Sequence, residues 1–224
     1  MRSTLLHRRL ITCGAALALS WAHPARADRY ETTLVLRPTG GVARIAEAGT
    51  DEIVQVRSRG FAGGASWGVR HWLDLGGELV AGYFDEASYR MATLPISVNP
   101  LSGPLKRTST IAQLRGVATL RLGVGWVPFV QLALGAGARH RTTALLYGPT
   151  TQGDRWLIPD GQRREVTIDL VTGLRAGLER RLTVHWAAGV SAAVSQSFGI
   201  FTPDLQTADV TVSVSYTWYP LLAP

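Results

Sequence analysis

The clearest pattern of apolar and polar positions lies near the C-terminus, from Ala208 to Tyr219. Every second residue from Ala208 to Trp218 is apolar, and the residues between them, beginning with Asp209, are polar or amphipathic. A side-chain period of two is typical of a β-strand with one apolar and one polar face. Average strands have ~5–6 residues, whereas ~9–11 tilted residues cross a bilayer. The pattern therefore predicts a strand that is long enough to span a membrane.

Seven further segments alternate in the same way, and Gly- and Pro-containing connections separate them. The expected strands are 30–44, 57–69, 77–89, 110–122, 126–146, 165–178 and 183–198. One face of most segments is apolar, and the other is rich in Gly, Ser, Thr and Ala with occasional charges. In 77–89 the face is ambiguous, because the set that contains Leu79 and Tyr83 is about as apolar as the set that contains Val80 and Phe84.

The connections between these segments alternate in length along the chain. Short turns are expected at 73–76, 123–125 and 179–181, and long loops at 92–108 and 147–164. Transmembrane barrels have short periplasmic turns and long external loops, whereas a soluble sandwich has no reason to put every short turn on one side. The sequence therefore predicts an all-β protein, an eight-stranded antiparallel up-and-down transmembrane β-barrel. Its last strand is expected to pair with the first, around residues 32–38.

Aromatic residues gather near the expected ends of the strands. Those near the short turns are Trp72, Trp126, Trp186, Tyr216 and Trp218, together with Tyr30 and Tyr219. Those toward the long loops are Phe61, Tyr83, Tyr147 and Phe198. Two belts of amphipathic rings at the ends of an apolar band are expected at membrane interfaces. The alternative is that these rings are the corners of a soluble core.

The N-terminus predicts a secretory signal peptide over residues 1–27, followed by a barrel domain over 28–224. Arg2, Arg8 and Arg9 precede an apolar run over 10–18, and Ala25-Arg26-Ala27 has the small-x-small form of a cleavage site. A lipoprotein signal at Cys13 is disfavoured, because Thr12 precedes it and the apolar run continues beyond it. After residue 27 there is no run of 18 apolar residues of the kind that forms a transmembrane helix.

Removal of the signal peptide changes the charge of the chain. The whole chain has a formal charge of +7, but the signal holds four of the 23 basic residues and none of the 16 acidic ones, which leaves 19 minus 16, or +3. A mildly basic surface does not argue for nucleic acid. The single cysteine also leaves with the signal, so neither a disulfide nor a thiolate metal site is expected. No metal or other cofactor is predicted, because no histidine lies at ligand spacing from Asp, Glu or another His.

The chain resembles the small eight-stranded outer-membrane barrels of Gram-negative bacteria, the OmpA transmembrane domain, OmpX and OmpW-like group. The similarity lies in Gly68–Leu73 before a tight turn, Gly135-Ala136-Gly137 after Pro128, and the aromatic end of the last strand. It implies a monomer in the outer membrane, in contact with outer-membrane lipid and inserted by the barrel-assembly machinery. In that group the chain usually ends in an aromatic residue, whereas here residues 220–224 follow Tyr219.

An eight-stranded barrel has an interior just wide enough for side chains to fill. The polar residues expected to form a hydrogen-bonded network there are Glu78, Arg115, Arg121, Gln131, Asp169, Arg175 and Asp209. Glu78 and Arg121 are expected at similar depth on neighbouring strands. Because buried charges must be paired, such a network is expected to plug the barrel; the alternative is a narrow ion path.

These observations predict an integral outer-membrane protein with a structural, adhesive or small-solute role, and not an enzyme. One alternative is a lipid-modifying enzyme, for which His140 with Ser195 or Ser197 is the only suitable pairing. Another is a soluble, lipocalin-like secreted carrier. Loop 147–164, which contains Trp156, is the first place to look for ligand or partner contacts, because loops often carry function.

Overall fold

The structure is a computed structural model that describes residues 31–46, 53–94, 101–123, 125–145, 148–149, 155–156, 162–199 and 205–219. The predicted signal peptide lies outside the described residues, as do Tyr30, Tyr147 and residues 220–224. No helix in the described part of the chain is long and apolar enough to cross a membrane.

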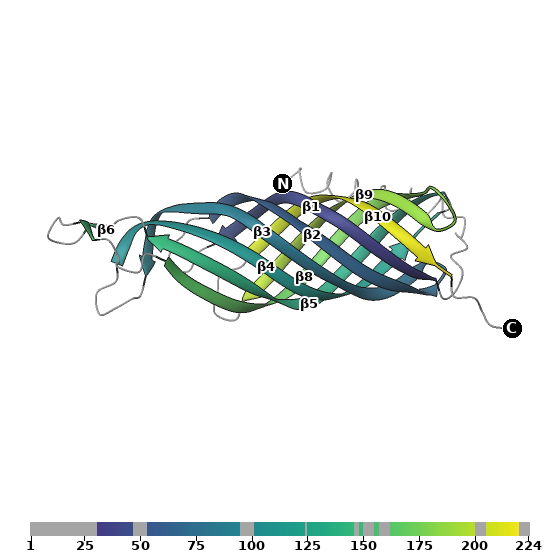
Figure 1. Cartoon of the computed structure of the whole chain (residues 1–224), viewed down its shortest axis with the longest axis horizontal. Coiled ribbons are helices and arrows are strands. Elements are labelled where there is room, and N and C mark those ends of the chain that lie inside the picture. Colours follow the sequence, from purple (N-terminus) through teal and green to yellow (C-terminus); the bar gives the residue numbers. More distant parts are fainter. Residues whose placement is uncertain are drawn as a thin grey trace, which may run out of the picture.

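Eight long antiparallel strands close into a barrel that is elongated along its axis (Figure 1). They are β1 Thr32–Ala46, β2 Ile53–Arg70, β3 Leu73–Leu94, β4 Leu101–Arg121, β5 Trp126–Leu145, β8 Gln162–Arg181, β9 Trp186–Gly199 and β10 Leu205–Trp218. Each strand pairs with its neighbours in chain order, and two short segments, β6 Gly148–Pro149 and β7 Arg155–Trp156, form a separate two-stranded sheet. The predicted all-β, up-and-down barrel is therefore confirmed.

The last strand closes the barrel against the first, as predicted. Leu34 of β1 lies opposite Tyr216 of β10, and Val35 lies opposite Ser215. Because every long strand thus has two neighbours, the barrel has no open edge, as a membrane barrel requires.

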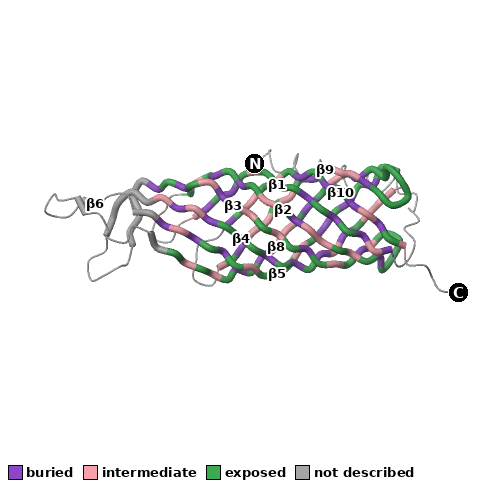
Figure 2. Tube along the Cα trace, in the orientation of Figure 1, coloured by how far each residue is buried: buried purple, intermediate pink, exposed green. Residues whose placement is uncertain are grey.

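Buried and exposed residues alternate along the strands (Figure 2). On β10, for example, Thr211, Ser213 and Ser215 are buried while Val212 and Val214 are exposed. The buried positions face the interior of the barrel and the exposed ones its outer wall. The ambiguous face of β3 is decided in the same way, because Leu79 and Tyr83 lie on the outer wall and Phe84 lies inside.

Two of the three predicted short turns are shifted in the structure. β3 already begins at Leu73, so the turn before it lies at residues 71–72 rather than 73–76. Likewise β8 continues to Arg181, and the turn lies at 182–185 rather than 179–181. Both shifts have one cause: Asp74 and Glu179, polar residues that resemble turn formers in sequence, point into the barrel and bind Arg121 there. The third turn is placed as predicted, and Gly123 and Gly125 adopt positive φ angles of 101° and 82°, which glycine accepts readily.

The strands also extend further toward the long-loop end than the sequence pattern indicated. The loop expected at 92–108 is mostly β-structure, since β3 runs to Leu94 and β4 starts at Leu101. β3, β4, β5 and β8 have 22, 21, 20 and 20 residues, compared with 14 in each of β9 and β10. One side of the barrel wall therefore projects beyond the other at this end (Figure 1). Irregular pairing of β3 with β4 between Phe84 and Ala87, and again between Tyr89 and Ala92, interrupts the alternation that would have revealed the extension.

Candidate functional site: the barrel interior

The centre of the interior is occupied by a buried carboxylate among three guanidinium groups. Glu78 Oε2 lies 2.9 Å from Arg175 Nη1 and also binds Arg37 Nη1, while Glu78 Oε1 lies 3.8 Å from Arg115 Nη1. These residues come from β3, β8, β1 and β4, so they meet across the lumen rather than along one strand. The group, with Gln131, is called the Glu78 cluster below.

Gln131 completes the Glu78 cluster from β5. Its side-chain oxygen accepts hydrogen bonds from Arg175 and, at 3.4 Å, from Arg37, while its amide nitrogen donates to Thr119 Oγ1 at 3.1 Å. The structure thus brings together four of the predicted network residues: Glu78, Arg115, Gln131 and Arg175. Sequence reasoning missed Arg37. The alternation along β1 places Leu34 and Leu36 on the outer face and Arg37 on the inner face of the same strand.

Nearer the short-turn end, Arg121 forms a second cluster with two carboxylates. Arg121 Nε lies 2.7 Å from Asp74 Oδ2, and Arg121 Nη1 lies 3.1 Å from Glu179 Oε2. The expectation that Arg121 lies level with Glu78 is wrong, because the residue opposite Glu78 on β4 is Arg115. The predicted register of β3 against β4 is wrong because it counts residues from a turn at 73–76, whereas β3 begins at Leu73. This group is called the Arg121 cluster.

The remaining two predicted network residues lie nearer the long-loop end and apart from both clusters. Asp169 Oδ2 accepts a hydrogen bond from Arg139 Nε at 2.7 Å, and both side chains are almost wholly buried. Asp209 Oδ1 accepts a hydrogen bond from Ser58 Oγ at 2.7 Å. Sequence reasoning missed Arg139 as a partner, although its position on the inner face of β5 follows from the alternation.

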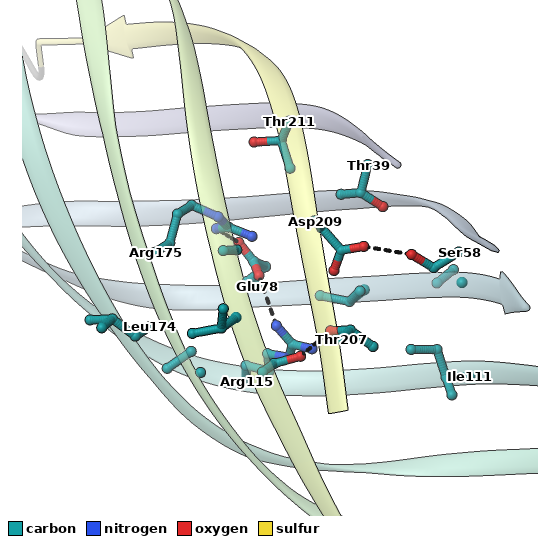
Figure 3. Close-up of a pocket in the computed structure, with 18 of the residues that line it drawn as sticks. Thr39, Ser58, Glu78, Ile111, Arg115, Leu174, Arg175, Thr207, Asp209 and Thr211 are labelled. Atoms are coloured by element: carbon teal, nitrogen blue, oxygen red, sulfur yellow. Dashed lines mark hydrogen bonds and ion pairs between the residues drawn. The ribbon is translucent and has the colours of Figure 1, made fainter. Parts of the chain in front are cut away.

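A cavity of about 40 Å³ lies between Glu78, Arg115 and Arg175 on one side and Ser58 and Asp209 on the other (Figure 3). One water needs roughly 10–15 Å³ on this measure, so the cavity has room for only a few.

Beyond this cavity, an apolar cluster fills the lumen toward the long-loop end. We call it the apolar plug; its members are Ala43, Ile45, Val56, Phe84, Ala87, Tyr89, Ile111 and Leu205. Phe84 and Leu205 are each 1% exposed, so their side chains are enclosed. An apolar group inside the barrel was not expected from the sequence, because small and polar residues dominate the inner faces. Phe84 could have been found only once the face of its strand was known.

The outer wall is an apolar band with aromatic side chains at both ends. Trp126, Trp186 and Trp218 are exposed near the short turns, and Trp72 lies in the turn before β3. The Trp186 and Tyr216 rings pack edge to face with centroids 4.9 Å apart, and the Arg180 guanidinium lies 5.1 Å from the centroid of the Trp126 ring. Toward the other end, the exposed aromatic residues are Phe61, Tyr83 and Phe198.

Tyr219 lies just beyond the last strand, at the short-turn end. Its hydroxyl donates a hydrogen bond to the Val184 carbonyl at 3.3 Å. Partial burial, and then the nearby Glu31 carboxylate, raise the pKa of the Tyr219 hydroxyl above its ordinary value, so it is the neutral, donating form that is present at physiological pH.

An apolar outer wall with a polar, ion-paired interior is the polarity of a membrane barrel and the reverse of a soluble one. The soluble, lipocalin-like alternative is therefore wrong. The fold is that of a small outer-membrane barrel. The expected location in the outer membrane follows from the same polarity, because closed barrels of this kind span that membrane.

The residues of the enzymatic alternative do not meet. His140 is exposed on the outer wall of β5, whereas Ser195 Oγ is inside the barrel, 2.7 Å from Thr207 Oγ1, and Ser197 is buried there as well. The barrel wall therefore separates the histidine from both hydroxyls. His185 lies in the turn before β9, where its Nδ1 is 2.9 Å from the Thr217 carbonyl oxygen. Within the described residues, no three His, Cys, Asp or Glu side chains are grouped to hold a metal ion.

No protein-family model and no curated protein matches this sequence. Several solved structures are similar to it. The attachment invasion locus protein Ail of Yersinia pestis is 14% identical with a TM-score of 0.49, covering 85% of this chain and 100% of that one. Neisserial surface protein A is 9% identical with a TM-score of 0.44, covering 83% and 97%. The N-terminal β-barrel domain of Pseudomonas aeruginosa OprF is 15% identical with a TM-score of 0.39, covering 85% and 100%.

Proposed function

We propose that this protein is a closed outer-membrane barrel that acts as a rigid anchor in a structural or adhesive role, and neither as a pore nor as an enzyme. The observation that carries the proposal is the Glu78 cluster. Its side chains come from β1, β3, β4, β5 and β8, five of the eight strands, so they bridge the lumen from opposite walls. Opening a path there would separate charges that are paired in a medium of low dielectric, which is costly.

The apolar plug supports the same proposal from a second position along the axis. Phe84, Ile111 and Leu205 converge inside the barrel on the long-loop side of the Glu78 cluster. An ion that passed the cluster would then meet side chains that offer it no hydrogen bonds. The Glu78 cluster and the apolar plug lie at different positions along the barrel axis. The removal of either one therefore leaves the other in place.

The projecting part of β3, β4, β5 and β8 supports the anchoring role (Figure 1). Extended, paired strands position their connecting segments more rigidly than a loop of the same length, and exposed loops on a rigid scaffold are common sites of recognition. We expect the barrel to be a monomer that contacts outer-membrane lipid and is inserted by the barrel-assembly machinery, since its strands leave no edge for a second copy.

Planar-bilayer recording tests whether the lumen conducts. Folded protein should give flat traces, and so should Arg115→Ala and Phe84→Ala, because each substitution leaves one obstacle intact. The double variant is the matched control that removes both obstacles, and it should raise the leak current. Stepwise conductance in the unmodified protein, altered by Arg115→Ala, would instead support small-solute passage.

Cell adhesion distinguishes an adhesive role from a purely structural one. Bacteria that display the protein would be compared with bacteria that display a variant in which β3 and β4 are joined just beyond the paired residues Phe84 and Ser109. Loss of attachment to host-cell matrix, with normal surface levels of the variant, supports adhesion. Equal attachment of the two kinds of bacteria would support the structural role instead.

A further inference from the structure

A groove of about 460 Å³ crosses the outer wall over β8, β9, β10 and β1. Its apolar wall is a row of outward side chains that lie opposite one another in the sheet: Val42 pairs with Ala208, Ala208 with Val194, and Val194 with Leu174. The groove exists because Ala208 is small and lies between two valines. An acyl chain lying against this row would bury apolar surface of the kind that the rest of the band presents to lipid.

A polar row runs beside the apolar one. Arg44 lies opposite Gln206, Gln206 opposite Gln196, and Gln196 opposite Thr172. All four residues line the groove. An arginine, two amides and a hydroxyl are therefore placed side by side on four neighbouring strands, facing out of the barrel.

Part of this polar row lies within the apolar band. On β9, Gln196 is the outward residue between Val194 and Phe198, and on β8, Thr172 lies between Leu174 and Leu170. A polar group that faces hydrocarbon is unfavourable unless it forms hydrogen bonds, so such positions are normally apolar. A row of them beside a groove is the arrangement expected where the polar part of an amphiphile meets the wall.

Arg44 gives the groove its charge. Among the described residues of the lining it is the only charged one, its side chain is exposed, and it forms no ion pair with any other described residue. A guanidinium binds phosphate through charge-assisted, often bidentate hydrogen bonds.

We propose that this groove binds one anionic phospholipid, with its phosphate on Arg44 and Gln206 and an acyl chain along Val42, Ala208, Val194 and Leu174. Gln196 then faces the polar linkage between headgroup and chain. The single cation among the described lining residues matches a single phosphate charge. The volume lies within the ~300–1,000 Å³ of small-molecule sites, which suits one chain with its headgroup better than a glycolipid with many chains.

Native mass spectrometry of the whole mature protein in non-ionic detergent tests the proposal. The probes are phosphatidylglycerol, zwitterionic phosphatidylcholine and lipid A at equal concentrations. The protein should retain one phosphatidylglycerol with a preference of about tenfold over phosphatidylcholine, because the choline cation of the latter offsets its phosphate charge and weakens the contact with Arg44. Arg44→Gln should abolish the preference, and Ala208→Phe, which fills the groove, should abolish binding of both phospholipids.

Arg164→Gln is the matched control, because Arg164 is also an exposed, outward arginine but lies on β8 outside the groove lining. It should keep the preference of the unmodified protein. The proposal is overturned if phosphatidylglycerol shows no preference, if Arg164→Gln has the same effect as Arg44→Gln, or if lipid A is preferred. A heat-modifiable gel band shows that each variant is folded. Failure here would leave the closed-lumen proposal intact, since the groove and the lumen lie on opposite sides of the wall.

Discussion

The inner and outer walls of the barrel consist of the same strands but follow opposite rules. On β8, Leu174 is 46% exposed on the outer wall, whereas the next residue, Arg175, is 6% exposed and binds Glu78 inside. In a soluble protein the leucine would be buried and the arginine exposed. Here the solvent of the outer wall is lipid, so the apolar side chain faces outward and the charged one turns toward the partners that neutralise it.

The difference between the walls shows where specificity lies. The outer wall needs only apolar side chains of modest size, and many sequences would satisfy it. The inner wall needs particular partners, because each buried charge has to meet an opposite charge or a hydrogen-bonding group. Substitutions should therefore have effects that depend first on which wall they fall on.

Glu78→Ala should have the largest effect. It removes the carboxylate that binds Arg37, Arg115 and Arg175 and leaves three guanidinium groups together in the lumen. Breaking a buried ion pair by removing one partner destabilises by roughly 3–5 kcal/mol. Urea unfolding in detergent micelles measures the change. A loss smaller than that caused by Val212→Arg would mean that water, rather than Glu78, stabilises the charges of these arginines.

Val212→Arg tests the outer wall. Val212 is 56% exposed at mid-strand on β10, facing lipid, and an arginine near the bilayer midplane costs roughly 2–4 kcal/mol. Its neighbour Ser213 faces the interior and provides the matched control, because Ser213→Ala removes only a small polar group. Unfolding in lipid vesicles should separate the two variants clearly. Equally mild effects would mean that the assignment of the walls is reversed.

Gly41→Ala and Gly40→Ala compare the walls with the same chemical change at adjacent positions. A Cβ on Gly41 would lie 2.1 Å from the Ala208 carbonyl oxygen, whereas a Cβ on Gly40 would meet nothing within 4 Å. Gly41→Ala should therefore destabilise by roughly 1–3 kcal/mol, the range for overpacking, because backbone of β10 has to move. Gly40→Ala should be neutral or slightly stabilising in the same unfolding experiment; equal losses would contradict the difference in packing.

Glu86→Gln should have the smallest effect. Glu86 Oε1 lies 2.7 Å from Lys106 Nζ, but the two side chains are 47% and 39% exposed. Exposed ion pairs contribute roughly 0–1 kcal/mol, and salt screens them. The variant should unfold at nearly the same urea concentration as the unmodified protein. A loss comparable to that of Glu78→Ala would show that exposure does not separate the two kinds of ion pair.

The sequence by itself determined the number of barrel strands, their order and, for most of them, which face is apolar, but not the short pair β6 and β7. These properties are local, because a period of two is visible within a single segment. The order of short and long connections follows from the number of residues between successive segments. The closure of β10 on β1 also followed, since an even set of antiparallel strands with no free edge allows little else.

Only the tertiary structure decided which charges meet. Glu78 contacts Arg37 and Arg175, which come from strands distant in the chain. Arg121 contacts Asp74 and Glu179 nearer the short-turn end of the barrel. Contacts across a barrel depend on the register of every pair of strands, and a period of two does not specify register. The apolar plug and the outer groove also depend on tertiary structure, because each is formed where side chains from four or five strands converge.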